Sequence, residues 1–145
     1  MTVSKDTIWP PSPAFFPPML HSIHHIAIIC TDYQVSKRFY TELMGLEIVR
    51  ETYRADRDSW KLDLAVGGAY QIELFSFPNP PFRPSQPEAR GLRHLAFAVA
   101  ELETTILRLN KHGIATESIR TDELTGKRFT FFADPDGLPL ELYEL

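Results

Sequence analysis

At 145 residues, the chain has the length of one domain or of two small modules that share a core. Its formal net charge of −4 and the lack of a basic run argue against a nucleic-acid partner or an anionic membrane surface. Cys30 is the only cysteine, which excludes an intrachain disulfide and a cysteine metal cluster and favours a reducing cytoplasm. No apolar stretch approaches the roughly 20 residues that a membrane-spanning helix needs.

Residues 1–21 are expected to form a proline-rich N-terminal arm. Prolines recur through this stretch and Lys5 is its only cation, so it does not have the pattern of a secretory signal. The composition predicts an extended arm, disordered or laid over a partner surface. A tail without a role of its own is the simpler interpretation.

Residues 22–76 predict a first βαβββ module. A strand over 23–29 is followed by a helix that begins at Thr31 or Asp32 and ends near Met44, before Gly45. The helix is expected to bury one face, formed by Val35, Phe39 and Leu43. Three strands should follow, at 47–53, 61–66 and 69–75, with Gly67-Gly68 as the last hairpin turn.

Residues 77–91 are predicted to be a stiff linker, because five prolines lie between Phe77 and Pro87. An alternative is that Phe82 and Arg83 form a rim of the functional site. Residues 92–145 then repeat the βαβββ plan, with a strand over 93–99, a helix over 102–112 and strands at 116–120, 128–133 and 138–143. The turn before the last strand is Asp134-Pro-Asp-Gly137.

Each module places a histidine at its first strand and a glutamate in its last. His25 precedes Glu73 by 48 residues, and His94 precedes Glu141 by 47 residues. Two imidazoles and two carboxylates in a repeated register are a typical ligand set for a divalent metal ion. The sequence therefore predicts a metal site made of His25, Glu73, His94 and Glu141.

Strand alternation supports this prediction. The two glutamates lie on strand faces opposite bulky apolar neighbours, so each sheet is expected to have one core face and one working face. A buried carboxylate needs a partner such as a metal ion. His24 should point to the face opposite His25, as a packing or supporting group and not as a ligand.

Other residues leave alternatives open. Tyr53, Trp60 and Phe129 could line a substrate cavity, although core packing suits each of them equally well. Three guanidinium groups could receive a substrate carboxylate, although a solvated strand face is the simpler interpretation for each: Arg54, Arg57 and Arg128.

The motifs resemble the vicinal-oxygen-chelate superfamily, which includes glyoxalases, bleomycin-resistance proteins and extradiol dioxygenases. The matching segments are His25-Ile-Ala-Ile, Phe39-Tyr-Thr-Glu-Leu-Met-Gly-Leu46, His94-Leu-Ala-Phe, and Asp134-Pro-Asp-Gly137 followed by Leu140-Glu-Leu142. The stretches Arg57–Lys61 and Lys127–Phe132 are similar to the bacterial YaeR-like branch of uncharacterised proteins. The resemblance implies an α+β fold over residues 22–145, in which two tandem βαβββ modules form a curved mixed sheet around a metal site.

Within this superfamily, the His, Glu, His, Glu ligand pattern resembles glyoxalase I. It implies a lyase or isomerase that acts on a hemithioacetal, a thiol adduct, or a related α-hydroxycarbonyl compound by proton transfer through a metal-bound enediolate. The resemblance implies Glu141 as the catalytic base, with Glu73 as its counterpart. The implied ion is Ni²⁺ or Zn²⁺, with Co²⁺, Mn²⁺ or Fe²⁺ as alternatives, and the expected assembly is a homodimer. The rival functions are a non-haem metal dioxygenase and a resistance-type protein that binds a small molecule.

Overall fold

The computed structural model describes residues 19–145, so the predicted arm over residues 1–21 falls almost entirely outside the described residues. The first module contains one helix, two shorter helical segments and four strands: β1 (Ile26–Cys30), α1 (Tyr33–Arg38), η1 (Phe39–Leu43), β2 (Glu47–Arg54), η2 (Ala55–Arg57), β3 (Ser59–Val66) and β4 (Ala69–Ser76). The second module contains β5 (Leu95–Val99), α2 (Leu102–Lys111), β6 (Arg120–Thr121), β7 (Arg128–Ala133) and β8 (Pro139–Glu144). This order confirms the predicted α+β fold of two βαβββ modules.

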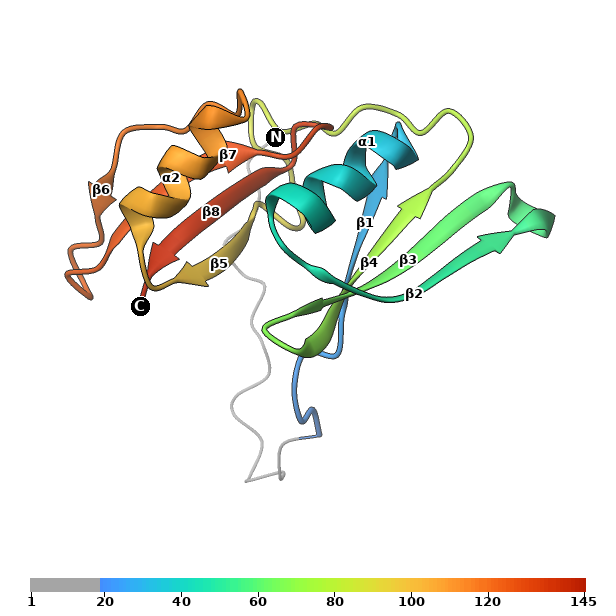
Figure 1. The fold of residues 1–145 in the computed structure, drawn as a ribbon, viewed down its shortest axis with the longest axis horizontal. Helices are drawn as coiled ribbons and strands as arrows, with labels where there is room; N and C mark the ends of the chain where they lie inside the picture. Colours follow the sequence, from blue (N-terminus) through green and yellow to red (C-terminus); the bar gives the residue numbers. More distant parts are fainter. Residues whose placement is uncertain (1–18) are drawn as a thin grey trace, which may run out of the picture.

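Each module forms its own four-stranded mixed sheet, in the orders β1-β4-β3-β2 and β5-β8-β7-β6 (Figure 1). In both sheets the first strand pairs in parallel with the last, and the remaining pairs are antiparallel. Within residues 19–145, β1 and β5 are edge strands that pair on one side only. The core faces are apolar, since the side chains of Leu62, Leu74, Leu140 and Leu142 have at most 1% of their surface exposed.

The first helix differs from the prediction in its register. The Asp32 side chain accepts a hydrogen bond from the Val35 backbone N–H and caps α1, and from Phe39 onward the helix continues as the π-helical turn η1. The buried positions of α1 are instead Tyr33 and Ser36. Phe39 is buried as expected, whereas Val35 is 40% exposed, so the prediction that Val35 faces the core was wrong.

The boundaries of several strands also differ from the prediction. The first strand of each module begins one residue after its histidine, because pairing starts at Ile26 in β1 and at Leu95 in β5. The strand expected at 116–120 is only the two-residue β6, Arg120–Thr121. The segment before β6 still contacts β7, since the Glu117 backbone N–H donates to the Phe131 carbonyl.

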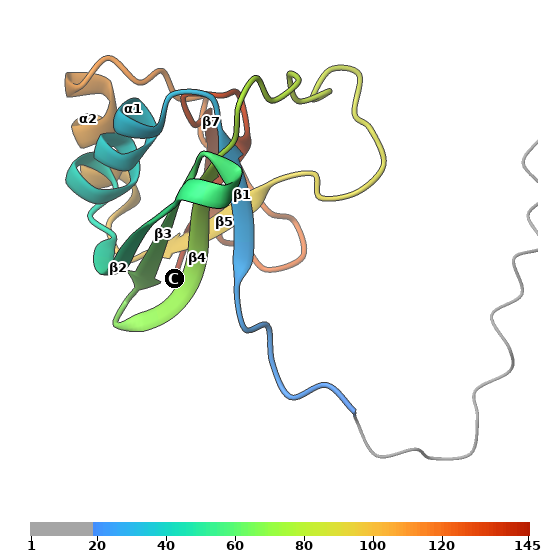
Figure 2. The same cartoon turned by 90° about the vertical axis from the view of Figure 1, so that its right-hand side faces the viewer.

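The modules join on their helical side. Both α1 and α2 cover the same side of the molecule, and the linker lies on the other (Figure 2). Tyr40, which is fully buried, donates a hydrogen bond to Asp134 of the second module at 2.7 Å. The Asp134 carboxylate also accepts hydrogen bonds from the backbone N–H groups of Asp136 and Leu138, so it shapes the turn that leads into β8.

Within residues 19–145, no helix is both long and apolar enough to cross a membrane.

Candidate metal centre

The first half-site is the pair of His25 and Glu73. Glu73 lies in β4, where its neighbours across the sheet are Ala27 in β1 and Asp63 in β3. The His25 Nε2 atom lies 3.5 Å from Glu73 Oε2, and the His25 side chain is 40% exposed. Glu73 itself is only 8% exposed, because its neighbours Ile72 and Leu74 anchor β4 in the core.

Two further side chains hold the Glu73 carboxylate. Lys61 on β3 places its Nζ atom 2.7 Å from Glu73 Oε1 and 3.0 Å from Asp63 Oδ1. The Tyr70 hydroxyl donates a hydrogen bond to the same Oε1 atom of Glu73. Burial pushes the pKa of Glu73 upward, but the hydrogen bonds from Lys61 and Tyr70 outweigh burial and hold this pKa below its ordinary value. Glu73 is therefore an ionised carboxylate in a fixed orientation.

His24 does not point away from His25, so this part of the prediction was wrong. The two Nδ1 atoms lie 2.8 Å apart, and the His24 ring also packs edge-on against Tyr70. The alternation of a strand does not apply here, because both histidines precede β1. His24 therefore contacts the predicted ligand His25, and its supporting role stays a prediction.

The second half-site is the pair of His94 and Glu141. Glu141 lies in β8, between Ala96 of β5 and Phe131 of β7. The His94 Nε2 atom lies 2.9 Å from Glu141 Oε2, and the His94 ring meets the Phe131 ring edge-on with centroids 5.0 Å apart. Within residues 19–145, His94 is the only side chain that hydrogen-bonds or ion-pairs with Glu141.

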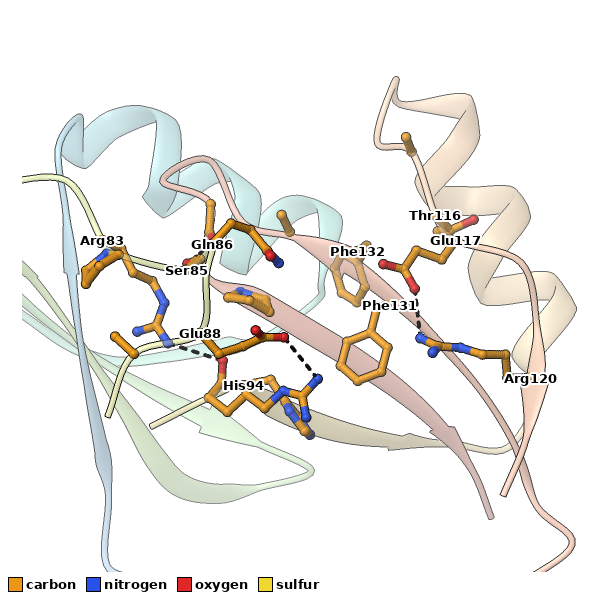
Figure 3. Close-up of a pocket in the computed structure, with 17 residues that line it drawn as sticks. Arg83, Ser85, Gln86, Glu88, His94, Thr116, Glu117, Arg120, Phe131 and Phe132 are labelled. Atoms are coloured by element: carbon orange, nitrogen blue, oxygen red, sulfur yellow. Dashed lines mark hydrogen bonds and ion pairs between the residues drawn. The ribbon is translucent and has the colours of Figure 1, made fainter. Parts of the chain in front are cut away.

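A cavity of about 580 Å³ opens beside the second half-site (Figure 3). His94 and the aromatic rings of Phe131 and Phe132 line it, together with charged groups from the linker and from the segment before β6. Arg83 of the linker also lines this cavity, whereas Phe82, the other residue of the alternative interpretation of the linker, does not. The Arg83 guanidinium donates to the backbone carbonyls of Leu92 and Arg93, and these hydrogen bonds close the loop from Arg83 to Leu92.

The structure brings the four predicted ligands together in pairs. Among the described residues 19–145, no three His, Cys, Asp or Glu side chains converge in a way that could hold a metal ion. Each pair nevertheless offers one imidazole and one carboxylate, the donor types that Zn²⁺ and Ni²⁺ accept. Glu141 is 8% exposed and its partner is an imidazole, so a cation would supply the compensation that a buried carboxylate needs. Each His–Glu pair therefore offers half of the four ligands that a divalent-metal site of this kind needs.

The arginines proposed from the sequence occupy other environments. Arg128 is bound between Glu103 and Glu144. Arg57 lies in the turn η2 near Asp56, and Arg54 lies over the rings of Phe75 and Phe77 while donating to Ser59.

The aromatic candidates lie outside the lining of the cavity beside His94, and Tyr53 is exposed and packs on Trp60. Trp60 packs against the hydrophobic core and stacks on Tyr33, whereas Phe129 stacks on Tyr143 and contacts Arg120.

Sequence reasoning missed Lys61, Tyr70 and Arg120. Strand alternation could have found Lys61 and Asp63, because both lie on the face of β3 that pairs with the Glu73 face of β4. Strand alternation could not have pointed to Arg120, because the strand that contains it is only two residues long.

Comparison with known proteins gives a consistent assignment. The family model of the glyoxalase/bleomycin resistance protein/dioxygenase superfamily matches residues 22–142. The chain is 63% identical to the uncharacterised protein YwkD of Bacillus subtilis (strain 168) over 126 residues, which are 87% of this chain and 98% of that protein. It is 61% identical to the uncharacterised protein YaeR of Escherichia coli (strain K12), over 86% of this chain and 97% of that protein. A solved structure of a glyoxalase family protein from Enterococcus faecalis is 52% identical and has a TM-score of 0.77, over 85% of this chain and 97% of that one.

Proposed function

The chain belongs to the glyoxalase/bleomycin resistance protein/dioxygenase superfamily, and from this premise we propose that it is a divalent-metal-dependent enzyme whose metal centre is completed by two copies of the chain. The observation that carries the proposal is the duplicated half-site. His25 with Glu73 and His94 with Glu141 occupy the same register in two separate sheets, each with two of the four ligands. A second copy related by two-fold symmetry would supply the missing half to both.

Apolar surface beside the half-sites supports the dimer. Ile29 on the edge strand β1 is 53% exposed, Leu92 is 50% exposed and Phe82 of the linker is 96% exposed. These residues line an apolar cavity of about 400 Å³ between β1 and the linker. Exposed apolar side chains next to an unpaired strand edge are typical of a surface that another chain covers.

The proposed ligands of each ion are His25 and Glu73 of one copy and His94 and Glu141 of the other. We favour Ni²⁺ or Zn²⁺, since two nitrogen and two oxygen donors leave positions for substrate oxygens. When bound, such an ion polarises substrate oxygens and increases the acidity of the neighbouring carbon. A solved structure of a fosfomycin resistance protein variant from Listeria monocytogenes, which shares this fold at 19% identity and a TM-score of 0.69, contains Mn(II).

The two carboxylates have different roles in this proposal. Lys61 and Tyr70 hold Glu73 as an ionised carboxylate, which suits a permanent ligand. Glu141 ion-pairs only with His94 among the described residues 19–145, and His94 lines the cavity, so Glu141 has no fixed cation and is the proposed group that accepts a proton from a substrate carbon and returns it to the adjacent one. The proposed reaction is therefore an isomerisation or lyase reaction of the glyoxalase I type, on a hemithioacetal or another α-hydroxycarbonyl compound.

A complementation experiment tests the shared centre. One variant carries His25→Ala with Glu73→Gln, and the other carries His94→Ala with Glu141→Gln. Each alone lacks half of every centre and is expected to bind no stoichiometric Ni²⁺ or Zn²⁺. A heterodimer refolded from both variants regains one complete centre if each centre joins two chains, and none if each centre lies within one chain. One ion per heterodimer, measured by elemental analysis, is the expected result.

An activity screen tests the reaction. Metal-loaded protein is assayed with the methylglyoxal adducts of glutathione, bacillithiol, coenzyme A and cysteine. Turnover of at least one adduct that depends on Glu141 is expected. Stoichiometric metal with no turnover of any adduct would reject the lyase, and oxygen-dependent cleavage of a catechol or tight binding of an unaltered small molecule would then favour one of the rival functions.

A further inference from the structure

We infer that the substrate carries a second anionic group, a carboxylate or a phosphate, and that Arg120 receives it in the cavity beside His94 and Glu141. The inference rests on the proposed function in one respect, namely that the reacting oxygens of the substrate bind at this half-site. Arg120 is the first residue of β6, and it lines the cavity together with His94 and Phe131 (Figure 3).

The Arg120 guanidinium is held in place by two aromatic rings. Its Cζ atom lies 5.1 Å from the Phe129 ring centroid and 5.3 Å from the Phe131 ring centroid. These rings are perpendicular to each other, with centroids 6.1 Å apart, so they support the guanidinium from two directions. A cation on an aromatic support keeps its N–H edge available, and a planar guanidinium edge matches a carboxylate or a phosphate.

The protein partner of Arg120 is exchangeable. The Arg120 Nη2 atom lies 2.8 Å from Glu117 Oε2, but the side chains are 53% and 61% exposed, respectively. An ion pair with this exposure contributes little to stability, because water competes for both charges. An anionic group of a ligand can therefore displace Glu117 or share the guanidinium with it at low cost.

The other two arginines of the cavity are less suited to this role. Arg83 already donates to the carbonyls of Leu92 and Arg93, so its guanidinium closes the linker loop. Arg93 faces Glu88 at 3.6 Å, and both side chains are more than half exposed without an aromatic support. Only Arg120 among these three combines a fixed position with free N–H groups.

Phe131 sets the spacing between the two binding positions. One side of its ring meets the His94 imidazole at a centroid distance of 5.0 Å, and Arg120 lies 5.3 Å from the same centroid. His94 and Arg120 therefore both contact the same phenyl ring. A ligand with two neighbouring oxygens at one end and an anionic group a few carbon atoms away can reach both.

Two matched pairs of small acids test this inference by isothermal titration calorimetry. D-Glycerate and 3-phospho-D-glycerate share the same 2-hydroxycarboxylate end and differ in the phosphate, and L-lactate and L-malate differ in a second carboxylate. Binding of at least one acid with the second anionic group is expected to be about tenfold or more tighter than that of its partner, as for charge-assisted hydrogen bonds to a guanidinium. The pair with the larger ratio identifies the preferred anion.

Arg120→Gln is expected to abolish this ratio, and Arg120→Lys is expected to retain part of it. Arg57→Gln is the matched control, because it removes the same charge from an exposed turn in the first module and should leave the ratio unchanged. Equal binding within both pairs, a ratio that survives Arg120→Gln, or a failure of all four acids to bind would overturn the inference.

The experiment separates this inference from the proposed function. Titrations are repeated with metal-loaded protein and with protein treated with a chelator, while metal content is measured independently. If the protein retains no metal, the proposed function fails, but an Arg120-dependent preference for the acid with the second anionic group would still support this site. Retained metal without any such preference would leave the proposed function intact and reject the anion site.

Discussion

The two half-sites share their backbone register but differ in their surroundings. In each, the glutamate lies opposite an alanine of the first strand, Ala27 or Ala96. On its other side Glu73 faces Asp63, whereas Glu141 faces Phe131. Lys61 and Phe129 occupy equivalent positions in the two sheets. Lys61 lies opposite Phe75, two residues after Glu73, and Phe129 lies opposite Tyr143, two residues after Glu141.

The first half-site is therefore ionic and the second is aromatic. Arg50 and Lys61 both contact Asp63, and Lys61 extends this network to Glu73. The corresponding positions around Glu141 offer aromatic rings and no cation other than the neighbouring histidine, if protonated. The positions of the proposed ligands depend on strand register, whereas the side chains of the neighbouring strand decide whether the carboxylate lies beside cations or beside aromatic rings.

Replacing the two glutamates should give the largest difference. Glu141→Gln is expected to lower turnover by about 10²–10⁴-fold, because the amide cannot accept a proton from carbon. Glu73→Gln is expected mainly to weaken metal binding, with a much smaller change in turnover per bound ion. Stopped assays on the active thiol adduct, with solvent deuterium counted in the product and metal content measured in each sample, distinguish the two effects. Similar losses of turnover per bound ion in both variants would contradict the division of roles.

Removing Lys61 tests the ionic half directly. Lys61→Met leaves the buried Glu73 without its cation, so the metal-free protein should lose about 2 kcal/mol of unfolding free energy. The loss should shrink in the metal-loaded protein, because the bound ion then compensates Glu73. Urea denaturation with and without Ni²⁺ measures both values.

Phe129→Leu is the matched control, because Phe129 holds the corresponding position in the second sheet. It removes ring contacts but no charge, so its effect on stability should be the same with and without metal. A Lys61→Met effect that does not depend on metal would show that Lys61 acts only through packing.

The sequence predicts the fold well because most of its signals are local. Gly67-Gly68, the apolar neighbours of Glu73 and Glu141, and the Asp134–Gly137 turn each determine a short stretch of chain, and the repeat assembles these stretches twice. The π-helical turn that begins at Phe39 includes Tyr40, which contacts Asp134 of the second module, and β6 pairs with β7 over only two residues; no local pattern contains these contacts. The aromatic support of Arg120 likewise depends on packing between neighbouring strands.

Tyr40→Phe tests whether the two modules are rigidly joined. The substitution removes the hydroxyl that reaches from the first module to Asp134 of the second, in a region where Tyr40 is fully buried and Asp134 is 5% exposed. A buried acceptor that loses one of its donors should lower the unfolding free energy by about 1–2 kcal/mol. Thermal unfolding should remain a single transition with a lower midpoint, whereas two separate transitions would show that the modules unfold independently.

The ionisation of Asp134 should give the smallest effect. Burial raises the pKa of Asp134 above its ordinary value, and the hydrogen bonds from Tyr40 and from the backbone of Leu138 and Asp136 offset this only in part. The folded state therefore holds a proton at this carboxyl more tightly than the unfolded state, whose value is about 3.9. Its contribution to stability is fully present below that value and is lost as the pH rises through the folded pKa.

Asp134→Asn removes this titration and keeps an oxygen that can accept both backbone N–H groups. The difference in unfolding free energy, wild type minus variant, should therefore decrease as the pH rises from about 3.5 to 7, by about 1.4 kcal/mol for each unit by which the folded pKa exceeds the unfolded one. Urea denaturation of both proteins over this range measures the difference. In a Tyr40→Phe background the carboxylate loses a donor, so the decrease should be larger and extend to higher pH. If this difference in unfolding free energy increased with pH, the surroundings of Asp134 would favour its ionised carboxylate, and the prediction would be wrong.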